Sequence, residues 1–144
     1  MGKFYTAMGL MSGTSLDGVD VSIIESDGNT DYSLVLDRYF AYDKELIQKL
    51  LNIRSKISNF DGLDKYLSEV KALEREITLF HAEAVNETLK KSGLSVDLIG
   101  FHGQTILHDP LQKISKQLGD GKLLSQLVKK KVVYDFRLSD IQNN

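Results

Sequence analysis

The residues that could do most chemistry stand near the start of the chain, where glycines, hydroxyls and carboxylates crowd together. The stretch is Gly9-Leu10-Met11-Ser12-Gly13-Thr14-Ser15-Leu16-Asp17-Gly18-Val19-Asp20. Glycine lets backbone N–H groups approach an anion closely, and hydroxyls add further donors. Carboxylates can hold a hydrated Mg²⁺ against phosphate oxygens. An ordinary hairpin turn is the simpler interpretation, but the loop is longer than a hairpin needs, so we predict that it binds phosphate.

This loop differs from the well-known nucleotide motifs. No Gly-Lys-Ser/Thr follows, as a P-loop would require, and the next predicted element is a strand rather than a helix. A dinucleotide-binding fingerprint also leads into a helix, so that motif does not fit either.

Two further polar segments follow predicted strands. The first is Gly100-Phe101-His102-Gly103-Gln104-Thr105 and the second is Tyr134-Asp135-Phe136-Arg137. Ligands in open α/β sheets bind at the carboxyl ends of strands. The first segment could therefore hydrogen-bond the hydroxyls or amide of a sugar, and Arg137 could meet a carboxylate or phosphate. The simpler alternatives are a polar turn and a surface arginine paired with a neighbouring carboxylate.

The elements that must position these segments follow from the spacing of apolar residues. Strict alternation predicts strands, a three- and four-residue spacing predicts helices, and Asp27-Gly28-Asn29 predicts a hairpin turn. Tyr32, Leu34, Leu36 and Phe40 are expected to share one face of their strand. In order, we predict strands over 4–11, 17–26 and 32–42, a helix capped by Asp43, a helix over 63–92, a strand over 96–101, a helix over 123–131 and a strand over 132–136.

This order predicts an α/β fold. The first three strands form an antiparallel meander, and each later strand follows a helix, which makes it parallel. We therefore expect a ribonuclease-H-like mixed sheet with helices on its faces. The 144 residues make one domain of ordinary size and leave no room for a second full lobe.

Composition excludes several classes of function. The 18 Lys and Arg against 20 Asp and Glu leave no positive excess for nucleic acid. The absence of cysteine excludes disulfides, thiolate nucleophiles and zinc–thiolate or iron–sulfur sites. No apolar run approaches the ~18 residues that a membrane helix needs, and no secretory core follows Met1. We expect a cytoplasmic protein with no membrane or nucleic-acid partner.

Taken together, these segments resemble the anhydro-N-acetylmuramic acid kinases of bacteria. The resemblance rests on the loop of residues 9–20, on residues 101–105 with His108 and Pro110, and on residues 133–137 with Asp140-Ile141. It implies one lobe of the fold shared by sugar kinases, actin and heat-shock chaperones. It also implies an enzyme that uses ATP, Mg²⁺ and water to open the 1,6-anhydro bridge of anhydro-N-acetylmuramic acid and phosphorylate its 6-oxygen, in peptidoglycan recycling.

The resemblance also implies roles for individual residues. Asp17 and Asp20 are both candidates for Mg²⁺ contacts through water, and His102, Gln104 and Arg137 are candidates for the sugar side of the cleft. The stretch implied to bind the ATP phosphates is Gly13, Thr14, Ser15, Leu16, Asp17, Gly18, Val19 and Asp20.

Family members are considerably longer than this chain. By the resemblance, the water-activating Asp belongs to an Asp-Thr-Gly-Pro-Gly-Asn motif in a second half, and these 144 residues do not contain that motif. We therefore assign no catalytic residue and expect residues 1–144 to be an N-terminal ATPase-like lobe. Such a lobe would be inactive without a C-terminal half or a homo-oligomeric partner. Phosphoryl transfer needs groups on several sides of the transferred phosphate to position it and to stabilise its negative charge.

Two other classes of function stay open at this point. One is a non-catalytic nucleotide-binding or scaffold domain that keeps the fold. The other is a small ribonuclease-H-like nuclease, in which Asp17, Asp20 and Asp135 would hold metal ions. The loop rich in glycine, serine and threonine suits a phosphate better than a two-metal centre.

Overall fold

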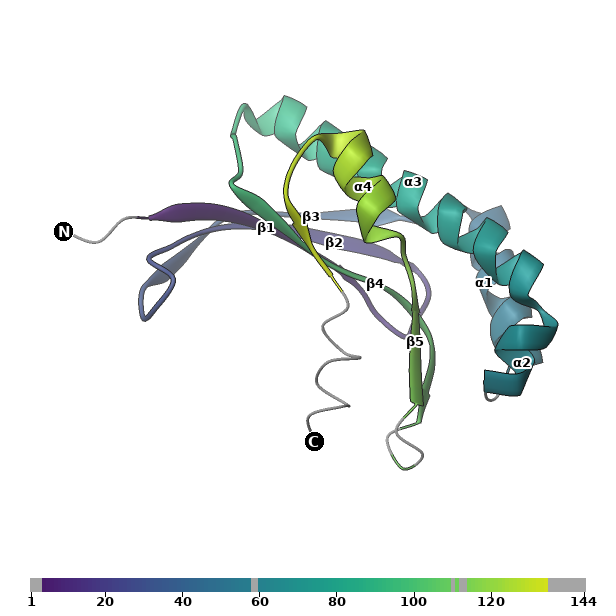
Figure 1. Ribbon diagram of the computed structural model, residues 1–144. Coiled ribbons are helices and arrows are strands. Elements are labelled where there is room, and N and C mark those ends of the chain that lie inside the picture. The colour runs from purple at the N-terminus through teal and green to yellow at the C-terminus, as the bar shows by residue number, and fades with distance from the viewer. Residues whose placement is uncertain (1–3, 58–59, 110, 112–113, 135–144) are drawn as a thin grey trace.

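The computed structural model describes residues 4–57, 60–109, 111 and 114–134, which form one sheet with helices packed against it (Figure 1). The strands are β1 (Tyr5–Ser12), β2 (Gly18–Ser26), β3 (Tyr32–Ala41), β4 (Leu98–Asp109), β5 (Ile114–Leu118) and β6 (Val132–Val133), and the helices are α1 (Lys44–Lys56), α2 (Phe60–Lys65), α3 (Leu67–Ser92) and α4 (Gly121–Val128).

The sheet is mixed, as predicted. Its strand order is β3-β2-β1-β4-β5, and β6 also pairs with β4. β1 runs antiparallel to β2 and parallel to β4, with Leu10 opposite Phe101. The pairing of β6 with β4 is parallel as well. Because β1 and β4 are neighbours, the loop that follows β1 lies beside the middle of β4.

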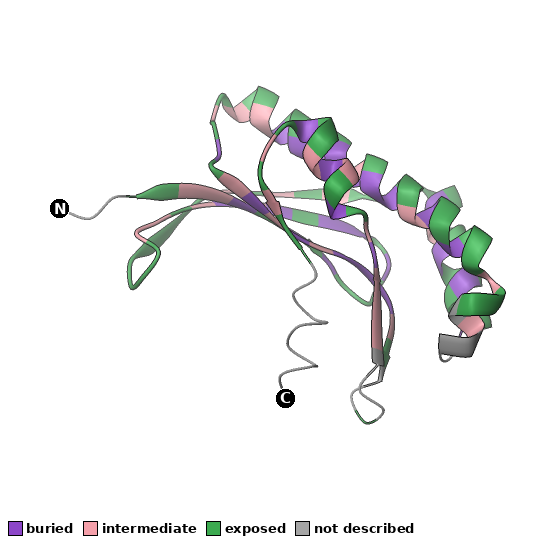
Figure 2. Cartoon of the chain, in the orientation of Figure 1, coloured by how far each residue is buried: buried purple, intermediate pink, exposed green. Residues whose placement is uncertain are grey.

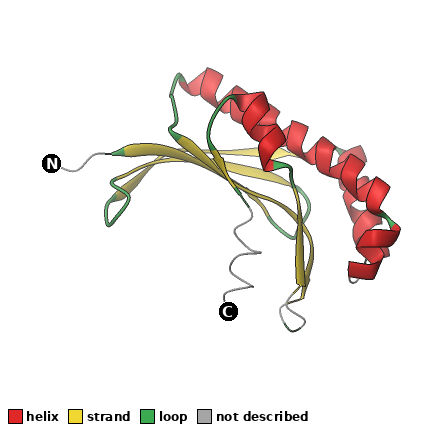
Figure 3. Cartoon of the chain, viewed as in Figure 1, coloured by secondary structure: helices red, strands yellow, loops and turns green. Residues whose placement is uncertain are grey.

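The helices gather on one face of the sheet (Figure 3). Apolar residues that alternate along β1 and β2 are buried in one cluster with apolar residues of the helices, among them Met8, Leu10, Val19, Val21 and Ile23. Figure 2 shows buried positions on both the strands and the helices. Side chains of the opposite face are open to solvent, and Met11 is 60% exposed. The core therefore lies between the helices and one face of the sheet. No helix among the described residues is both long and apolar enough to cross a lipid bilayer.

The helix ends follow local signals. The Asp43 carboxylate caps α1 by accepting from the N–H of Leu46 at 2.8 Å. Gly93 ends α3 in the left-handed region, with φ 70°. The helix predicted over 63–92 is two helices, because the backbone at Tyr66 leaves helical geometry between α2 and α3. The helix predicted over 123–131 ends at Val128, because Lys129 adopts φ 56°.

The strands differ from prediction at three places. β4 does not stop at 101 but runs on to Asp109, and it pairs there with β5, a strand that the sequence pattern did not predict. The strand predicted over 132–136 has two residues within the described part of the chain. In β3, a bulge places Leu36 opposite Ile23 but Leu34 opposite Ile24. The expectation that Leu34 and Leu36 share a face is wrong, because one extra residue reverses the alternation.

Candidate functional site

The first five residues of the predicted phosphate stretch 13–20, residues 13–17, form the loop that connects β1 to β2 and lies beside β4. The N–H of Leu16 donates to the carbonyl of Gly13 at 3.3 Å, so Thr14 and Ser15 form the exposed tip of a tight turn. Leu16 combines a left-handed backbone, φ 60°, with a side chain that is fully buried in the core. A branched apolar residue rarely adopts this conformation. The buried side chain therefore anchors the loop against the core at a cost in backbone strain.

Three carbonyls of the loop are held by groups outside it. The side-chain N–H of Gln104 donates to the carbonyl of Gly13 at 2.7 Å. The guanidinium of Arg54, in the last turn of α1, donates to the carbonyl of Thr14 at 2.9 Å. The backbone N–H of Tyr42 donates to the carbonyl of Asp17 at 2.9 Å. Strand β4 and the region around α1 thus share in fixing the loop.

Holding these carbonyls also decides where the loop's N–H groups point. In a planar trans peptide, the C=O of one residue and the N–H of the next point in opposite directions. Because the carbonyls of Gly13 and Thr14 are fastened, the N–H groups of Thr14 and Ser15 face away from those anchors. No acceptor within the described residues takes either N–H. Neighbouring backbone N–H groups that point outward form a site to which an anion can bind.

Two carboxylates stand where the loop enters β2. The Asp17 carboxylate accepts from the Ser15 hydroxyl at 2.5 Å. That hydrogen bond, followed by one from the Tyr39 hydroxyl, holds the pKa of Asp17 below its usual value. The pKa of Tyr39 is raised, first by desolvation and then by the neighbouring charges of Asp17 and Asp20. Both carboxylates therefore lie close to the same tyrosine.

Gly18 makes this arrangement possible. A Cβ at this position would lie 2.5 Å from the Phe40 carbonyl oxygen and 2.6 Å from the Tyr39 hydroxyl. Any other residue would push Tyr39 away from the carboxylates. Val19 follows with its side chain fully buried, so the last three residues of the predicted phosphate stretch already belong to β2.

The two carboxylates fit a hydrated Mg²⁺ better than a fully protein-bound metal. Mg²⁺ usually keeps several waters and takes only one or two carboxylates from a protein. Within the described residues, no group of three or more acidic, histidine or cysteine side chains gathers at one point. Asp17 and Asp20 can therefore serve as partners for the water shell of the ion.

A buried polar network lies directly beneath the loop. It joins side chains from β1, the segment between β3 and α1, α3 and β4, which are Ser12, Tyr42, His81 and Gln104, each at most 4% exposed. Ser12 Oγ lies 2.9 Å from His81 Nε2, and the Tyr42 hydroxyl donates to Gln104 Oε1 at 3.0 Å. His81 Nδ1 lies 2.7 Å from the carbonyl of Ile77, so it carries the proton and Nε2 accepts from Ser12.

Burial keeps this network uncharged at neutral pH. Desolvation raises the pKa of Tyr42 to about 12 and lowers the pKa of His81 to about 4. The sequence pattern, which placed His81 within the helix predicted over 63–92, did not connect it with the loop. The available signal was its spacing from Ile77 and Ala84, both on the buried stripe of α3.

The residues predicted to contact the sugar differ in their burial. His102 is half-buried on β4, with Nε2 3.4 Å from the Thr105 hydroxyl. Gln104, by contrast, is fully buried and bonded into the network. Arg137 and Asp135 lie outside the described residues. The structure thus joins Gln104 to the phosphate loop through the Gly13 carbonyl, with its side chain turned inward, and places His102 two residues earlier on the same strand.

A bulge in β4 explains the direction of Gln104. Leu10 pairs with Phe101 but Ser12 pairs with Gln104, so β4 has one residue more than β1 in this interval. Gly103 takes up the irregularity with φ 83°, and a Cβ there would lie 2.6 Å from the Leu118 carbonyl oxygen. Gln104 therefore lies on the same face as Ser12, above which the helices pack.

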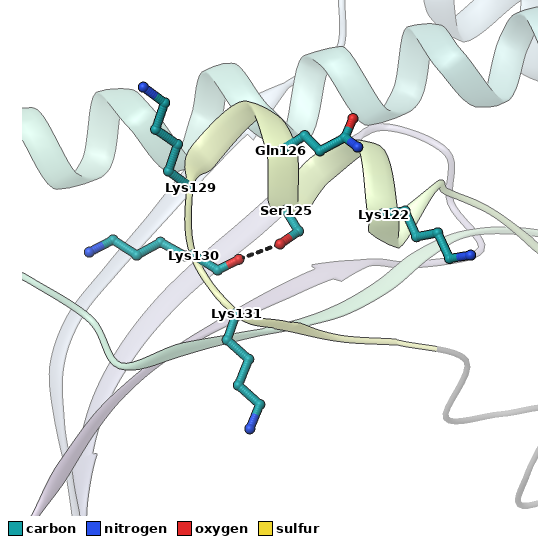
Figure 4. A pocket seen from close by; sticks show the side chains of 6 residues that line it. All are labelled: Lys122, Ser125, Gln126, Lys129, Lys130 and Lys131. Atoms are coloured by element: carbon teal, nitrogen blue, oxygen red, sulfur yellow. Dashed lines mark hydrogen bonds between the residues drawn. The ribbon is translucent and has the colours of Figure 1, made fainter.

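A second group of polar residues surrounds an open hollow at the end of α4 (Figure 4), lined by Lys122, Ser125, Gln126, Lys129, Lys130 and Lys131. Its lysine side chains point in different directions, and the Ser125 hydroxyl donates to the Lys130 carbonyl at 2.6 Å. The hollow therefore offers no convergent set of donors.

The mixed sheet and its loop define one lobe of a sugar-kinase-like α/β fold. The family model described as anhydro-N-acetylmuramic acid kinase matches residues 5–143, and the chain belongs to that family.

Curated relatives agree with this assignment. An anhydro-N-acetylmuramic acid kinase of Pelagibacter ubique is 55% identical over 99% of this chain, and the chain spans 38% of that relative. Proteins of the same name from Rhodopseudomonas palustris and Gluconobacter oxydans are 42% and 44% identical, over 94% and 95% of the chain. The chain thus spans well under half the length of these relatives.

Proposed function

We propose that this chain provides the ATP-phosphate-binding lobe of a cytoplasmic carbohydrate kinase. The reaction is the opening of the 1,6-anhydro bridge of anhydro-N-acetylmuramic acid by water and phosphorylation of its 6-oxygen by ATP, in peptidoglycan recycling. The observation that carries the proposal is the loop of residues 13–17, in which fastened carbonyls leave the N–H groups of Thr14 and Ser15 open to an anion. Membership of the family supports the choice of reaction.

Each residue of the loop has a part in this proposal. The N–H groups of Thr14 and Ser15 and the hydroxyl of Thr14 donate to phosphate oxygens, and Gly13 leaves room for close approach. Asp17 and Asp20 hold Mg²⁺ through its waters. Mg²⁺, when bound, neutralises charge on the phosphates that the loop binds. The lowered pKa of Asp17 supports this role, because the carboxylate stays ionised at neutral pH.

His102 and Arg137 are proposed to contact the sugar. His102 follows Phe101, which pairs with Leu10, so it stands on the strand beside the start of the phosphate loop. That position supports contact with a substrate bound next to the terminal phosphate. Gln104 belongs to the same segment, but its buried side chain favours a different role.

The chemistry also needs groups that this chain does not contain. Phosphoryl transfer depends on groups that surround the transferred phosphate, position it and stabilise its negative charge. We therefore propose that residues 1–144 act together with a further polypeptide segment, in the same chain or in a partner, that brings the water-activating base.

Calorimetric titration with ATP and Mg²⁺ tests the proposal. The chain should release heat on binding, and the Asp17→Ala variant should not. Asp27→Ala is the matched control, because Asp27 is an acid of the neighbouring hairpin turn, and it should bind as the unchanged chain does. A complete absence of heat from the unchanged chain would favour a scaffold domain instead.

A product assay tests the need for a second segment. Incubated alone with ATP, Mg²⁺ and the anhydro sugar, the chain should form no phosphosugar, and adding a complementing C-terminal half should restore it. Robust turnover by the chain alone would contradict this part of the proposal.

A further inference from the structure

The polar atoms of the Gln104 side chain are all hydrogen-bonded within the protein. Its two N–H groups donate to the carbonyls of Gly13 and Thr105, at 2.7 and 3.2 Å. Its oxygen accepts from the Tyr42 hydroxyl at 3.0 Å. The residue is fully buried. No donor of Gln104 is left for a ligand, so its contribution to the site passes through the carbonyl of Gly13.

Two carbonyls and Tyr42 together decide which way the Gln104 amide points. The carbonyls of Gly13 and Thr105 can only accept, so they require the amide nitrogen. The amide oxygen then faces the Tyr42 hydroxyl, which donates to it at 3.0 Å. Ser12 Oγ lies 3.3 Å from the same hydroxyl and can also accept, because Ser12 gives its own proton to His81. The Gln104 oxygen is the nearer of these two acceptors for the Tyr42 proton.

Gln104 in turn sets the orientation of one peptide plane. The carbonyl of Gly13 and the N–H of Thr14 belong to the same planar unit and point in opposite directions. With the carbonyl held inward at 2.7 Å, the N–H of Thr14 points outward. Without this hydrogen bond the plane could rotate, because Gly13 accepts a wide range of backbone angles.

We propose that Gln104, oriented by Tyr42, is a positioning residue that holds the Thr14 N–H ready for a phosphate oxygen of a nucleoside triphosphate. This inference rests on the proposed function of the loop and assigns a new role within it. The pair acts on nucleotide through Gly13 and Thr14 and touches no ligand itself.

The test uses the chain with Tyr42→Phe, which removes a single hydroxyl. Thr88→Val is the matched control, because Thr88 is fully buried and its hydroxyl donates to the Ala84 carbonyl within α3, away from the network. Both variants should lower the melting temperature by similar amounts. Only Tyr42→Phe should weaken binding of ATP–Mg²⁺, by about three- to tenfold in calorimetry, the usual effect of one hydrogen bond.

A second variant and a second measurement sharpen the test. Gln104→Glu keeps the size of the side chain but replaces the donor to Gly13 by an acceptor, so the affinity for ATP should fall by about tenfold or more. Should Gln104→Glu not fold, Tyr42→Phe carries the test alone. In the free chain, the ¹⁵N order parameter of the Thr14 amide should fall in Tyr42→Phe and stay unchanged in Thr88→Val.

The outcomes separate the two proposals. If the unchanged chain binds ATP and Tyr42→Phe binds it within about twofold, the positioning role is overturned and the phosphate-binding function stands. If Thr88→Val weakens binding as much as Tyr42→Phe, the effect is one of general stability and the positioning role is again overturned. If the unchanged chain binds no ATP, the proposed function fails, and the positioning role toward nucleotide fails with it.

Discussion

The meander contains two connections between neighbouring strands, and they are built in opposite ways. The connection between β2 and β3 satisfies itself. The Asp27 carboxylate accepts from the N–H groups of Asn29, Thr30 and Asp31, at 2.8, 3.0 and 3.1 Å. Gly28 supplies the positive φ of 80° that the turn needs. The N–H groups of this turn are therefore bonded within the turn itself, and these hydrogen bonds do not depend on distant residues.

The connection between β1 and β2 depends on distant residues. Its carbonyls are held by Gln104, 91 positions away, and by Arg54, 40 positions away. Leu16 takes the left-handed backbone that glycine takes in the other turn. The backbone N–H groups of Thr14 and Ser15 have no acceptor in the part of the chain that the structure describes. A turn that only reverses the chain pairs its own N–H groups. This loop leaves two N–H groups available and relies on residues outside the loop to hold its shape.

The largest expected difference between the two connections concerns the buried anchor. Leu16→Ala should lower the free energy of unfolding by about 3–4 kcal/mol, because it leaves a cavity at a fully buried position. Urea unfolding at pH 7 measures this loss. Truncation of the exposed Thr30 to alanine in the other turn should have little effect. A loss at Leu16 no larger than at Thr30 would show that the side chain does not anchor the loop.

The two connections should also respond to different ranges of pH. Burial lowers the pKa of His81 from 6.5 to about 4, so between these values the unfolded chain binds the proton and the folded chain does not. Stability therefore falls as the pH drops from 6.5 toward 4, by roughly 3 kcal/mol at most. Hydrogen bonds from backbone N–H groups, that of Asn29 first, lower the pKa of Asp27 from 3.8. Its stabilising contribution is lost only below that pH.

Urea unfolding at pH 7.5 and pH 4.5, for the unchanged chain and for His81→Gln, measures the first of these effects. The variant should lose less stability between the two pH values, because glutamine does not titrate. Equal losses in both proteins would show that His81 is not the titrating group.

A smaller effect is expected at Gly28. Gly28→Ala should lower the free energy of unfolding by about 1 kcal/mol, because alanine is strained at φ 80° while its Cβ meets no atom within 4 Å. Thermal unfolding measures this change, and ATP affinity should be unaltered. A change in ATP affinity would contradict the separation of the two connections.

The smallest expected effect compares the two residues other than glycine that have positive φ, Leu16 and Lys129. Lys129→Gly should stabilise the chain by about 0.5–1 kcal/mol, because Lys129 is the exposed left-handed cap of α4. Leu16→Gly relieves the same strain but removes a buried side chain, so it should destabilise. Thermal melting of both variants checks the opposite signs, and shifts of equal sign would contradict this account.

Local signals made much of the fold predictable. The alternation of β1 and β2, the Asp43 cap and the end of the long helix at residue 92 each depend on signals within a few residues, and the structure confirms them. The family was also recognisable, because the stretch from Gly9 to Asp20 is long and specific.

Distant contacts decide the features that were missed. Gln104 looks like part of a polar turn until the bulge in β4 turns it toward Ser12. In β5, only Leu118 is buried among the residues whose burial is described, which leaves no apolar alternation to detect. His81 is a polar residue on an apolar stripe, and its partner Ser12 lies 69 positions away.

The hydrogen bond from Gln104 to Gly13 also has a consequence for synthesis. The loop leaves the ribosome early, but its anchor is made 91 residues later, roughly five to twenty seconds at ordinary rates of elongation. During that interval β1 and β2 can already pair, because their contact is local. The nascent chain therefore passes through a stage in which the hairpin exists and the loop between its strands has no fixed shape.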